Sequence, residues 1–398
     1  MPVMSSVRWT IGHGIRDIGG RRVYVVLSGQ DPAAREIMLG IAGIAASRGW
    51  FLLWGMTSHS TDRDMRALDV HAAIVLPGVS RLPPSGLTVV AAGTDLTARG
   101  IPSVVTDDFQ IGQTAGKYLL DKGIRSLATF GEARWPWVQA RAAGLRQAAR
   151  DAGGDVHVND WLRDNDDPAL LAPTWCHPES FHSWLQQLPR PAGILAACDH
   201  WADVLCLTIR AAGLRVPDDV AVIGVDNDVV ACEFCNPPLT SVSLPHRRVG
   251  AEAALLVERG MQRPARGAEL IRLPGGAIVE RRSTDMLAIP DPDVVAALAY
   301  IRNHATNLIR VADVLRHVPT YQHRLERGFR KYLGRTMLNE IRRVHVEHAK
   351  RLLVMTDLPI PEVAVRSGFR NTTKLGIAFR QLMGITPSSY RKQHTTLS

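Results

Sequence analysis

The chain has 398 residues, of which 46% are hydrophobic and 21% charged, a composition typical of a folded protein with two or three domains. No apolar run approaches the roughly 20 residues that cross a bilayer. Residues 1–22 lack the apolar core of a secretory signal. These features exclude membrane and secreted proteins, and they predict a cytoplasmic protein without a membrane partner.

The net charge of +9 is unevenly distributed along the chain. Residues 291–398 carry 18 Lys and Arg residues against 8 Asp and Glu residues, whereas the first 290 residues are nearly neutral. A basic segment beside a neutral one favours a polyanion, such as a nucleic acid, as the partner of the basic segment. A basic face that contacts only solvent is the alternative.

The five cysteines are an odd number, which argues against a disulfide framework. Cys232 and Cys235 have the spacing of a metal-binding pair, but no second pair completes a tetrahedral site. We therefore expect buried or loop thiols, and neither a metal nor a cofactor.

Short apolar runs alternate with amphipathic stretches from Val23 onward, after a basic N-terminal extension over residues 1–22. The expected strands are Val23–Leu27, Phe51–Trp54, Ala73–Leu76, Val89–Ala91, Ser126–Phe130, Ile194–Ala197 and Val220–Val225. The expected helices are Ala33–Arg48, Ile111–Lys122, Gln139–Ala152, Trp201–Ala212 and Arg248–Arg259. This alternation predicts parallel sheets covered by helices, and roughly eleven to twelve strands are too many for one usual sheet. Residues 23–285 are therefore expected to form a two-lobed α/β module with a cleft.

Polar and aromatic residues follow the carboxyl ends of these strands, where such sheets bind their ligands. The set suits a sugar, because carboxylates and guanidinium groups bond to adjacent hydroxyls and an indole packs on the apolar face of the ring. The candidate effector-binding residues are Ser28, Gln30, Asp31, Asp107, Arg134, Trp135, Trp137, Arg141, Cys198, Asp199 and Asp226. Two alternatives stay open, because Asp199 also suits a helix N-cap and Trp135 or Trp137 also suits the core.

Four stretches of this module resemble the periplasmic-binding-protein-like sensor of the lactose-repressor family. They are Asp107–Gly112, Arg141–Leu145, Ile194–Asp199 and Val222–Asp226. The resemblance implies that Asp107, Arg141 and Asp226 touch the effector, and that Cys198 stands where the family often has a polar contact. The chain departs from the family in lacking its N-terminal helix-turn-helix, since the first strand begins by Val23. DNA contacts are therefore expected elsewhere.

An enzyme is the other function that an α/β module supports. Gly12, Gly14 and Gly19 precede the first strand and lack the G-x-G-x-x-G spacing of a dinucleotide site. No G-x-x-x-x-G-K-[ST] loop occurs, and no recognised motif places a Ser/His/Asp or Cys/His set. The sequence therefore does not predict catalysis.

Residues 286–398 are expected to be helical after the Pro290-Asp291-Pro292 break. Leu325-x-x-x-Phe329-Arg330 with Gly334 recurs 50 residues later as Leu375-x-x-x-Phe379-Arg380 with Gly384. Each copy predicts a short helix, a tight turn and a second helix, the arrangement that places a recognition helix in the major groove. The two copies predict an all-α domain of two helix-turn-helix units that binds double-stranded DNA.

The candidate DNA contacts surround the start of each second helix on its outward face. Arg suits guanine edges, Asn and Gln suit adenine, and Lys and Thr suit phosphates. The candidates are Gln322, His323, Arg324, Arg327, Arg330, Lys331, Arg370, Asn371, Thr372, Thr373, Lys374 and Arg380.

The two units closely resemble the DNA-binding domain of the arabinose-regulator (AraC) family through Ala349–Leu353, Gly368-Phe369, Phe379-Arg380, Gly384–Pro387 and Tyr390-Arg391. A lactose-repressor-type sensor before this domain is the layout of bacterial regulators of pentose catabolism, to which Glu280–Asp285, Tyr300–Ala305 and Arg134-Trp135 are also similar. The resemblance implies a homodimeric activator that is switched by D-xylose or a related monosaccharide and contacts RNA polymerase. Gly376 and Ile377 depart from the family's usual polar residues. A sugar-binding or sugar-modifying protein without a gene-regulatory role, and a regulator of a different metabolite, are the alternatives.

Overall fold

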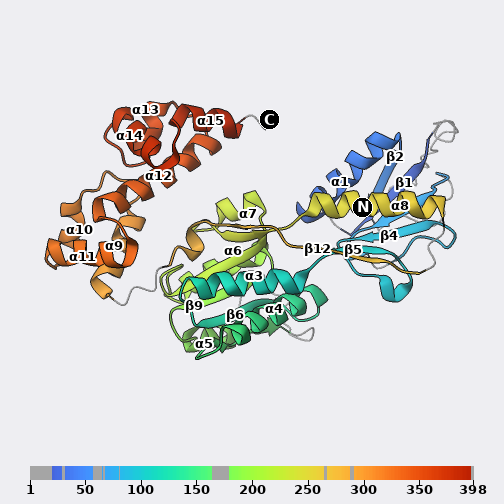
Figure 1. Ribbon diagram of the computed structural model, residues 1–398, viewed down its shortest axis with the longest axis horizontal. Helices are drawn as coiled ribbons and strands as arrows, with labels where there is room; N and C mark the ends of the chain where they lie inside the picture. The colour runs from blue at the N-terminus through green and yellow to red at the C-terminus, as the bar shows by residue number, and fades with distance from the viewer. Residues whose placement is uncertain are drawn as a thin grey trace, which may run out of the picture. The chain divides into compact units, whose positions relative to one another are not determined.

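The computed structural model describes residues 20–28, 32–56, 65, 68–79, 81–163, 179–263, 267–286 and 291–395. The chain divides into two compact units, Met1–Asp285 and Met286–Ser398. The first unit is an α/β structure and the second is all helical (Figure 1). This architecture confirms the predicted fold class.

The first lobe of the α/β unit contains a six-stranded parallel sheet in the order β12-β5-β4-β3-β1-β2. Its strands are β1 (Arg22–Leu27), β2 (Phe51–Met56), β3 (Ala72–Val75), β4 (Thr88–Ala92), β5 (Ser103–Thr106) and β12 (Leu270–Leu273). Helices α1 (Pro32–Arg48) and α8 (His246–Gln262) pack together, and both contribute to a buried core with β1, β3 and β4. Because the strands are parallel, their carboxyl ends lie at one edge of the sheet.

The second lobe contains a seven-stranded sheet in the order β13-β11-β10-β9-β6-β7, with β8 also paired to β6. Its strands are β6 (Ser126–Glu132), β7 (His157–Val158), β8 (Trp161–Arg163), β9 (Ala192–Ala196), β10 (Val220–Asp226), β11 (Thr240–Ser243) and β13 (Ile278–Val279). The strands are parallel except for the pair of β11 and β13. The helices of this lobe are α3 (Asp108–Asp121), α4 (Pro136–Ala152), α5 (Glu179–Gln187), α6 (Asp199–Ala211) and α7 (Val229–Phe234).

The chain passes between the lobes three times, after β5, after β11 and after β12. All seven predicted strands and five predicted helices of the unit are confirmed, with ends displaced by at most three residues. The starts of α3, α4, α6 and α8 each lie two or three residues before the predicted start. The apolar periodicity begins only after the first turn of these helices, because that turn faces the space between the lobes.

Helices α1 and α8 of the first lobe cross at a glycine from each helix. A Cβ added to Gly40 would lie 1.9 Å from the carbonyl oxygen of Arg247, and one added to Gly250 would lie 1.9 Å from that of Ile37. These distances are far below van der Waals contact, so a larger residue requires the backbones to separate. The two helices are therefore packed backbone against backbone.

Helices α3 and α4 of the second lobe repeat this arrangement. A Cβ added to Gly112 would lie 1.8 Å from the carbonyl oxygen of Arg141, and one added to Gly144 would lie 1.9 Å from that of Phe109. The crossing brings the first turn of α3 close to α4. It therefore places Asp108 within reach of the Arg141 side chain.

The helical unit consists of α9 (Pro292–Asn303), α10 (Val311–His317), α11 (Gln322–Leu333), α12 (Met337–Met355), α13 (Ile360–Arg366), α14 (Thr372–Met383) and α15 (Pro387–Thr395). The predicted helix-turn-helix units are α10 with α11 and α13 with α14. The long helix α12 adds Ile341 and Val344 to the first buried core and Ala349 and Leu353 to the second. Because α12 enters both cores, the two helix-turn-helix units belong to one compact body, Met286–Ser398.

We expect Gly40→Ala to destabilise the protein by about 1–3 kcal/mol, because the Arg247 carbonyl fills the space of the added methyl. Gly43→Ala is the matched control on the same helix, since no atom lies within 4 Å of a Cβ added to Gly43. The control should keep or raise the stability, by up to about 1 kcal/mol of helix propensity. Urea unfolding followed by circular dichroism measures both variants, and equal effects would contradict the close crossing.

Candidate effector cavity and DNA-binding surface

A cavity of about 300 Å³ lies at the carboxyl ends of the strands of both lobes. This volume is within the range of small-molecule sites, roughly 300–1,000 Å³. Strand ends and helix first turns supply most of its wall, including Pro77, Gly93, Thr106, Asp108, Trp137, Cys198, Asp199, His200, Asp226 and His246. The wall therefore combines carboxylates, imidazoles, one indole and the guanidinium of Arg141.

Arg141 is buried in this wall and holds three groups together. Its Nε donates to Oδ1 of Asp108 at 2.9 Å, and its Nη1 donates to the carbonyl oxygen of Ala197. Its guanidinium carbon lies 4.7 Å from the centroid of the Trp137 ring. Burial raises the pKa of Asp108, although the Arg141 charge opposes the shift. The pair fixes a carboxylate and an indole in one orientation.

Three indoles stack beside Arg141. The ring centroids of Trp135 and Trp137 are 6.4 Å apart, and those of Trp137 and Trp201 are 5.9 Å apart, with interplanar angles of 28° and 22°. Trp137 lines the cavity, whereas Trp135 lies outside its lining, 5.0 Å from the guanidinium carbon of Arg134. Trp137 thus forms part of the cavity wall, and its neighbours hold its orientation.

Asp199 lies in the cavity wall with 1% of its surface exposed. Its carboxylate accepts hydrogen bonds from Ser241 Oγ at 2.6 Å, from the Asp228 amide at 2.7 Å and from Cys232 Sγ at 3.4 Å. Burial is the main reason that the pKa of Asp199 is raised to about 7. The expectation of an Asp199 N-cap is wrong, because Cys198 takes the N-cap position of α6 and Asp199 is the first helical residue. Its side chain instead holds the loop after β10.

That loop contains two consecutive non-glycine residues with positive φ, Asp226 at 111° and Asn227 at 53°. Such conformations cost of order 1–3 kcal/mol each and are concentrated at functional sites. Asp226 lines the cavity, with its Oδ1 at 3.4 Å from Nε2 of His246. The Asn227 amide donates to Ser241 Oγ at 3.0 Å. The loop therefore presents one side chain to the cavity and the next to Arg281.

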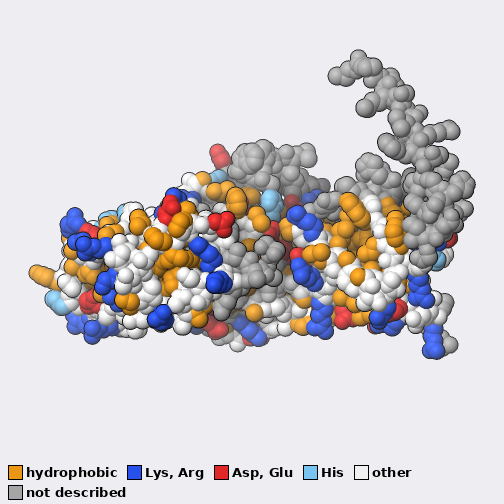
Figure 2. Space-filling model, turned by 90° about the horizontal axis from the view of Figure 1, so that it is seen from above, with side chains coloured by type: hydrophobic (Ala, Val, Ile, Leu, Met, Phe, Trp, Pro, Cys, Tyr) orange, Lys and Arg blue, Asp and Glu red, His pale blue; other side chains and the backbone are white. Residues whose placement is uncertain are grey.

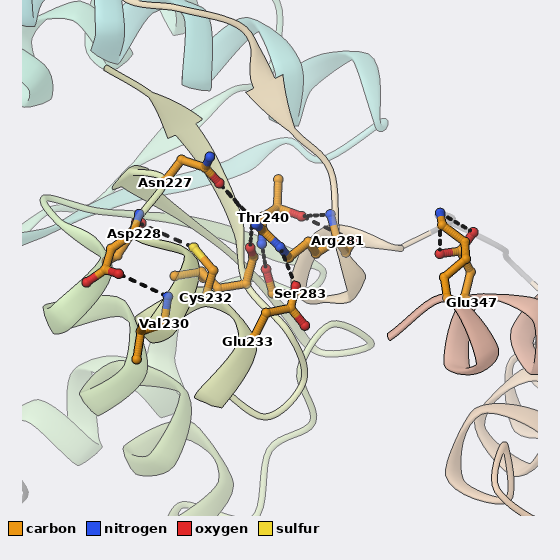
Figure 3. A network of polar contacts seen from close by, with 12 residues as sticks. Asn227, Asp228, Val230, Cys232, Glu233, Thr240, Arg281, Ser283 and Glu347 are labelled. Atoms are coloured by element: carbon orange, nitrogen blue, oxygen red, sulfur yellow. Dashed lines mark hydrogen bonds and ion pairs between the residues drawn. The ribbon is translucent and has the colours of Figure 1, made fainter. Parts of the chain in front are cut away.

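Arg281 joins this loop to the last segment of the α/β unit (Figure 3). Its Nη1 and Nη2 both donate to Oδ1 of Asn227 at 3.0 Å, and its Nε donates to Oε1 of Glu233 at 3.0 Å. Two residues later, Ser283 Oγ donates to the carbonyl oxygen of Val222 on β10 at 2.6 Å. The helical unit begins at Met286. The segment that precedes Met286 in the chain is thus hydrogen-bonded to β10 and to the loop after it, which contains Asp226 and Asn227.

The structure brings five predicted effector-binding residues to the cavity, namely Trp137, Arg141, Cys198, Asp199 and Asp226. Four lie outside its lining, because Ser28 bonds to the Pro77 carbonyl, Asp107 caps α3 through the Gln110 amide, and Arg134 and Trp135 stack on each other. Gln30 and Asp31 fall outside the described residues. Asp108, His200 and His246 also line the cavity but were not predicted, because they belong to first turns of helices whose starts were predicted too late.

Four of the five thiols lie among the described residues. Cys206, Cys232 and Cys235 are buried and free, and Cys198 lines the cavity, where burial raises its pKa to about 12. Cys176 lies outside the described residues. In the part of the chain that the structure describes, no group of three or more His, Cys, Asp or Glu residues is arranged to hold a metal ion.

All twelve predicted DNA-contact residues are exposed on the helical unit, and Figure 2 shows Lys and Arg side chains on its visible face. Several of the twelve also make contacts within the unit, including Lys331 over the Tyr332 ring and His323 stacked on Tyr321. Arg324 Nη2 lies 3.3 Å from Oδ2 of Asp293, and Oδ1 of Asn371 accepts from the Lys374 amide at 3.0 Å to cap α14. The outward faces of α11 and α14 therefore carry basic and hydroxyl side chains that DNA can reach.

Known protein families match both units. Residues 117–284 match the periplasmic binding protein-like domain, and residues 315–393 match the helix-turn-helix domain. The xylose operon regulatory protein of Escherichia coli K12 is 30% identical over 293 residues, which are 72% of this chain and 73% of that protein. The repressor CytR of the same strain is 27% identical over 270 residues, covering 63% of this chain and 76% of its own.

Solved structures agree with the fold. A xylose-binding transcription activator, xylR, aligns with a TM-score of 0.73 at 23% identity, covering 95% of this chain and 99% of its own. The regulator CelR in complex with cellobiose gives a TM-score of 0.54 at 21% identity, over 67% of this chain and 86% of its own. None of the helices among the described residues has the length and apolar character that crossing a membrane requires. These relatives regulate transcription and are not enzymes. The chain belongs to the family of the xylose operon regulatory proteins, DNA-binding transcription regulators in which a sensor of the sugar-binding, periplasmic-binding-protein-like fold precedes an AraC-type helix-turn-helix domain.

Proposed function

We propose that the protein is a cytoplasmic, homodimeric activator of pentose-catabolic genes, which a monosaccharide, D-xylose first, switches from the sensor cavity. The observation that carries the proposal is a 300 Å³ cavity in which carboxylates, Arg141 and Trp137 meet, in a chain that also contains two helix-turn-helix units. The names of the relatives support the pentose, since one is a xylose operon regulatory protein and another a xylose-binding activator. Contact with RNA polymerase is part of the proposed activation.

The chemistry of the wall suits a neutral sugar. Asp108 and Asp226 offer oxygen acceptors to adjacent hydroxyls, and the indole of Trp137 adds apolar surface to the wall for the ring carbons. The sugar acts only through its different affinity for two arrangements of the lobes. A change in lobe arrangement would alter the spacing of the DNA-binding domains of two subunits.

We expect Asp226→Asn to weaken D-xylose binding about 10- to 100-fold, because a hydrogen bond to a charged group contributes about 1.5–3 kcal/mol. Asp155→Asn is the matched control, since Asp155 is an exposed carboxylate outside the cavity lining. Isothermal calorimetry with D-xylose, L-arabinose and D-ribose measures the effect. Heat and thermal stabilisation from another sugar, with none from D-xylose, would refute the choice of xylose.

DNA binding should depend on Arg330 and Arg380, which occupy equivalent exposed positions of α11 and α14. We expect Arg330→Ala and Arg380→Ala each to reduce affinity for all duplexes alike, and to lower the slope of log affinity against log salt by about 0.9 per lost phosphate contact. Gel shifts with promoter DNA across a salt series measure this. A protein that shifts no promoter fragment in preference to unrelated DNA would refute the regulatory function.

We propose that the bonds between Asn227 and Arg281 carry the sugar signal to the segment before Met286. Asn227→Gly suits the positive φ and removes the carboxamide oxygen that accepts both guanidinium bonds. Sugar affinity should change less than about 3-fold, whereas the sugar-induced change in DNA affinity should shrink about 2- to 30-fold, the range for residues along a coupling route.

Glu280→Gln is the control for this coupling test. It removes the exposed ion pair with Lys122, at 3.1 Å, from the neighbouring position of the same segment without touching the cavity loop. Calorimetry and gel shifts with and without sugar separate binding from response. A full sugar response in Asn227→Gly, or an equal loss in Glu280→Gln, would contradict the proposed route.

A further inference from the structure

The two recognition helices, α11 and α14, present equivalent positions to the outside. Over residues 321–330 and 371–380 the order of buried, half-buried and exposed residues is identical. Phe329 and Phe379 are both fully buried in their own cores, and both helices are followed by a left-handed glycine, Gly334 or Gly384. Residues 50 positions apart therefore occupy the same place in their units. A chemical difference at an exposed place is a difference in what each unit contacts.

One of the differences between the exposed residues at these places sets a charged side chain against an apolar one. Arg327 of α11 corresponds to Ile377 of α14, an isoleucine that is 51% exposed. The preceding position is the half-buried Glu326 in the first unit and Gly376 in the second. No atom lies within 4 Å of a Cβ added to Gly376. The second helix thus places an apolar side chain beside an open position without a side chain.

Ile377 lies on the basic side of α14. Lys374 and Arg380 stand three residues before and after it, on the same face of the helix, and both are exposed. A β-branched residue lowers helix propensity, so the exposed isoleucine does not favour the helix itself. Lys374 and Arg380 suit phosphates, so Ile377 between them would face the base edges. The apolar group that the major groove offers there is the C5 methyl of thymine.

We propose that α14 recognises a thymine methyl through Ile377, whereas α11 recognises a guanine edge through Arg327. Gly376 leaves room for the backbone of α14 to approach the base edge closely. The assignment rests on the proposed contact of both helices with the operator, and it specifies the base chemistry of that contact. Each half-site then contains a thymine opposite α14 and a guanine opposite α11.

The test uses base analogues that remove single groups. The full chain selects duplexes from a random pool, and each thymine of the selected duplex is then replaced by deoxyuridine, which lacks only the C5 methyl. Replacing the contacted thymine in one half-site should weaken binding about fourfold, the loss for one buried methyl group. The same replacement should change the affinity of Ile377→Ala less than about 1.5-fold, because its partner is already missing.

Arg327→Ala is the matched control at the equivalent place. It should keep the deoxyuridine effect and lose sensitivity to 7-deazaguanine, which lacks the N7 acceptor. Selected duplexes that tolerate every deoxyuridine, or an Ile377→Ala variant that keeps the effect, would overturn the thymine assignment and leave DNA binding itself intact. A pool that yields no preferred sequence would overturn both the assignment and the proposed function.

Gly376→Ala distinguishes close approach to DNA from a structural role. Alanine favours a helix more than glycine, and the space around Gly376 is open, so the thermal midpoint should stay or rise. The affinity for the selected duplex should nevertheless fall, because the new methyl occupies space beside the base edges. Unchanged affinity in this variant would overturn the close approach.

Discussion

The parallel direction of the strands is the constraint on which the effector cavity depends. Each parallel strand ends at the same edge of its sheet, and α3, α4, α6 and α8 begin beside that edge, so their first turns meet around one space. The positive ends of helix dipoles favour nearby carboxylates. Asp108 and Asp199, each the first residue of a helix, are placed to benefit from this field. This field opposes, without cancelling, the burial and the repulsion by Asp226 that raise the pKa of both carboxyls.

The same constraint explains which site residues the sequence predicted. Strand ends are visible as the last residue of an apolar run, so Cys198 and Asp226 were found. First-turn residues that face a cavity need not follow the apolar period, so Asp108, His200 and His246 were missed, although Trp137 and Asp199, also in first turns, were predicted. In the pair Asp107-Asp108, the first carboxylate caps α3 through the Gln110 amide and the second turns to Arg141. The preference of Asp for N-caps applies to both residues of the pair, so it does not show which of them caps the helix.

Long-range bonds are the part of the site that the sequence could not supply. Arg281 bonds to Asn227, 54 positions earlier, and Ser283 bonds to Val222, 61 positions earlier. These partners follow from the pairing of β11 with β10 on one side and with β13 on the other, which no local pattern specifies. The helix-turn-helix units were predictable for the opposite reason. Their 50-residue repeat is local in each copy, and the same burial order appears in both.

The unequal recognition faces of the two units have a geometric consequence for the operator. Helix α12 enters both cores, so α11 and α14 keep a fixed order within one chain. With Arg327 on one face and Ile377 on the other, exchanging the two ends of a half-site would bring an arginine to a methyl group and an isoleucine to a polar base edge. Such an exchange would weaken binding, because the buried guanidinium loses its hydrogen-bond partner. The proposed contacts therefore give the half-site a direction, so that two half-sites in the same orientation would not be equivalent to two in opposite orientations.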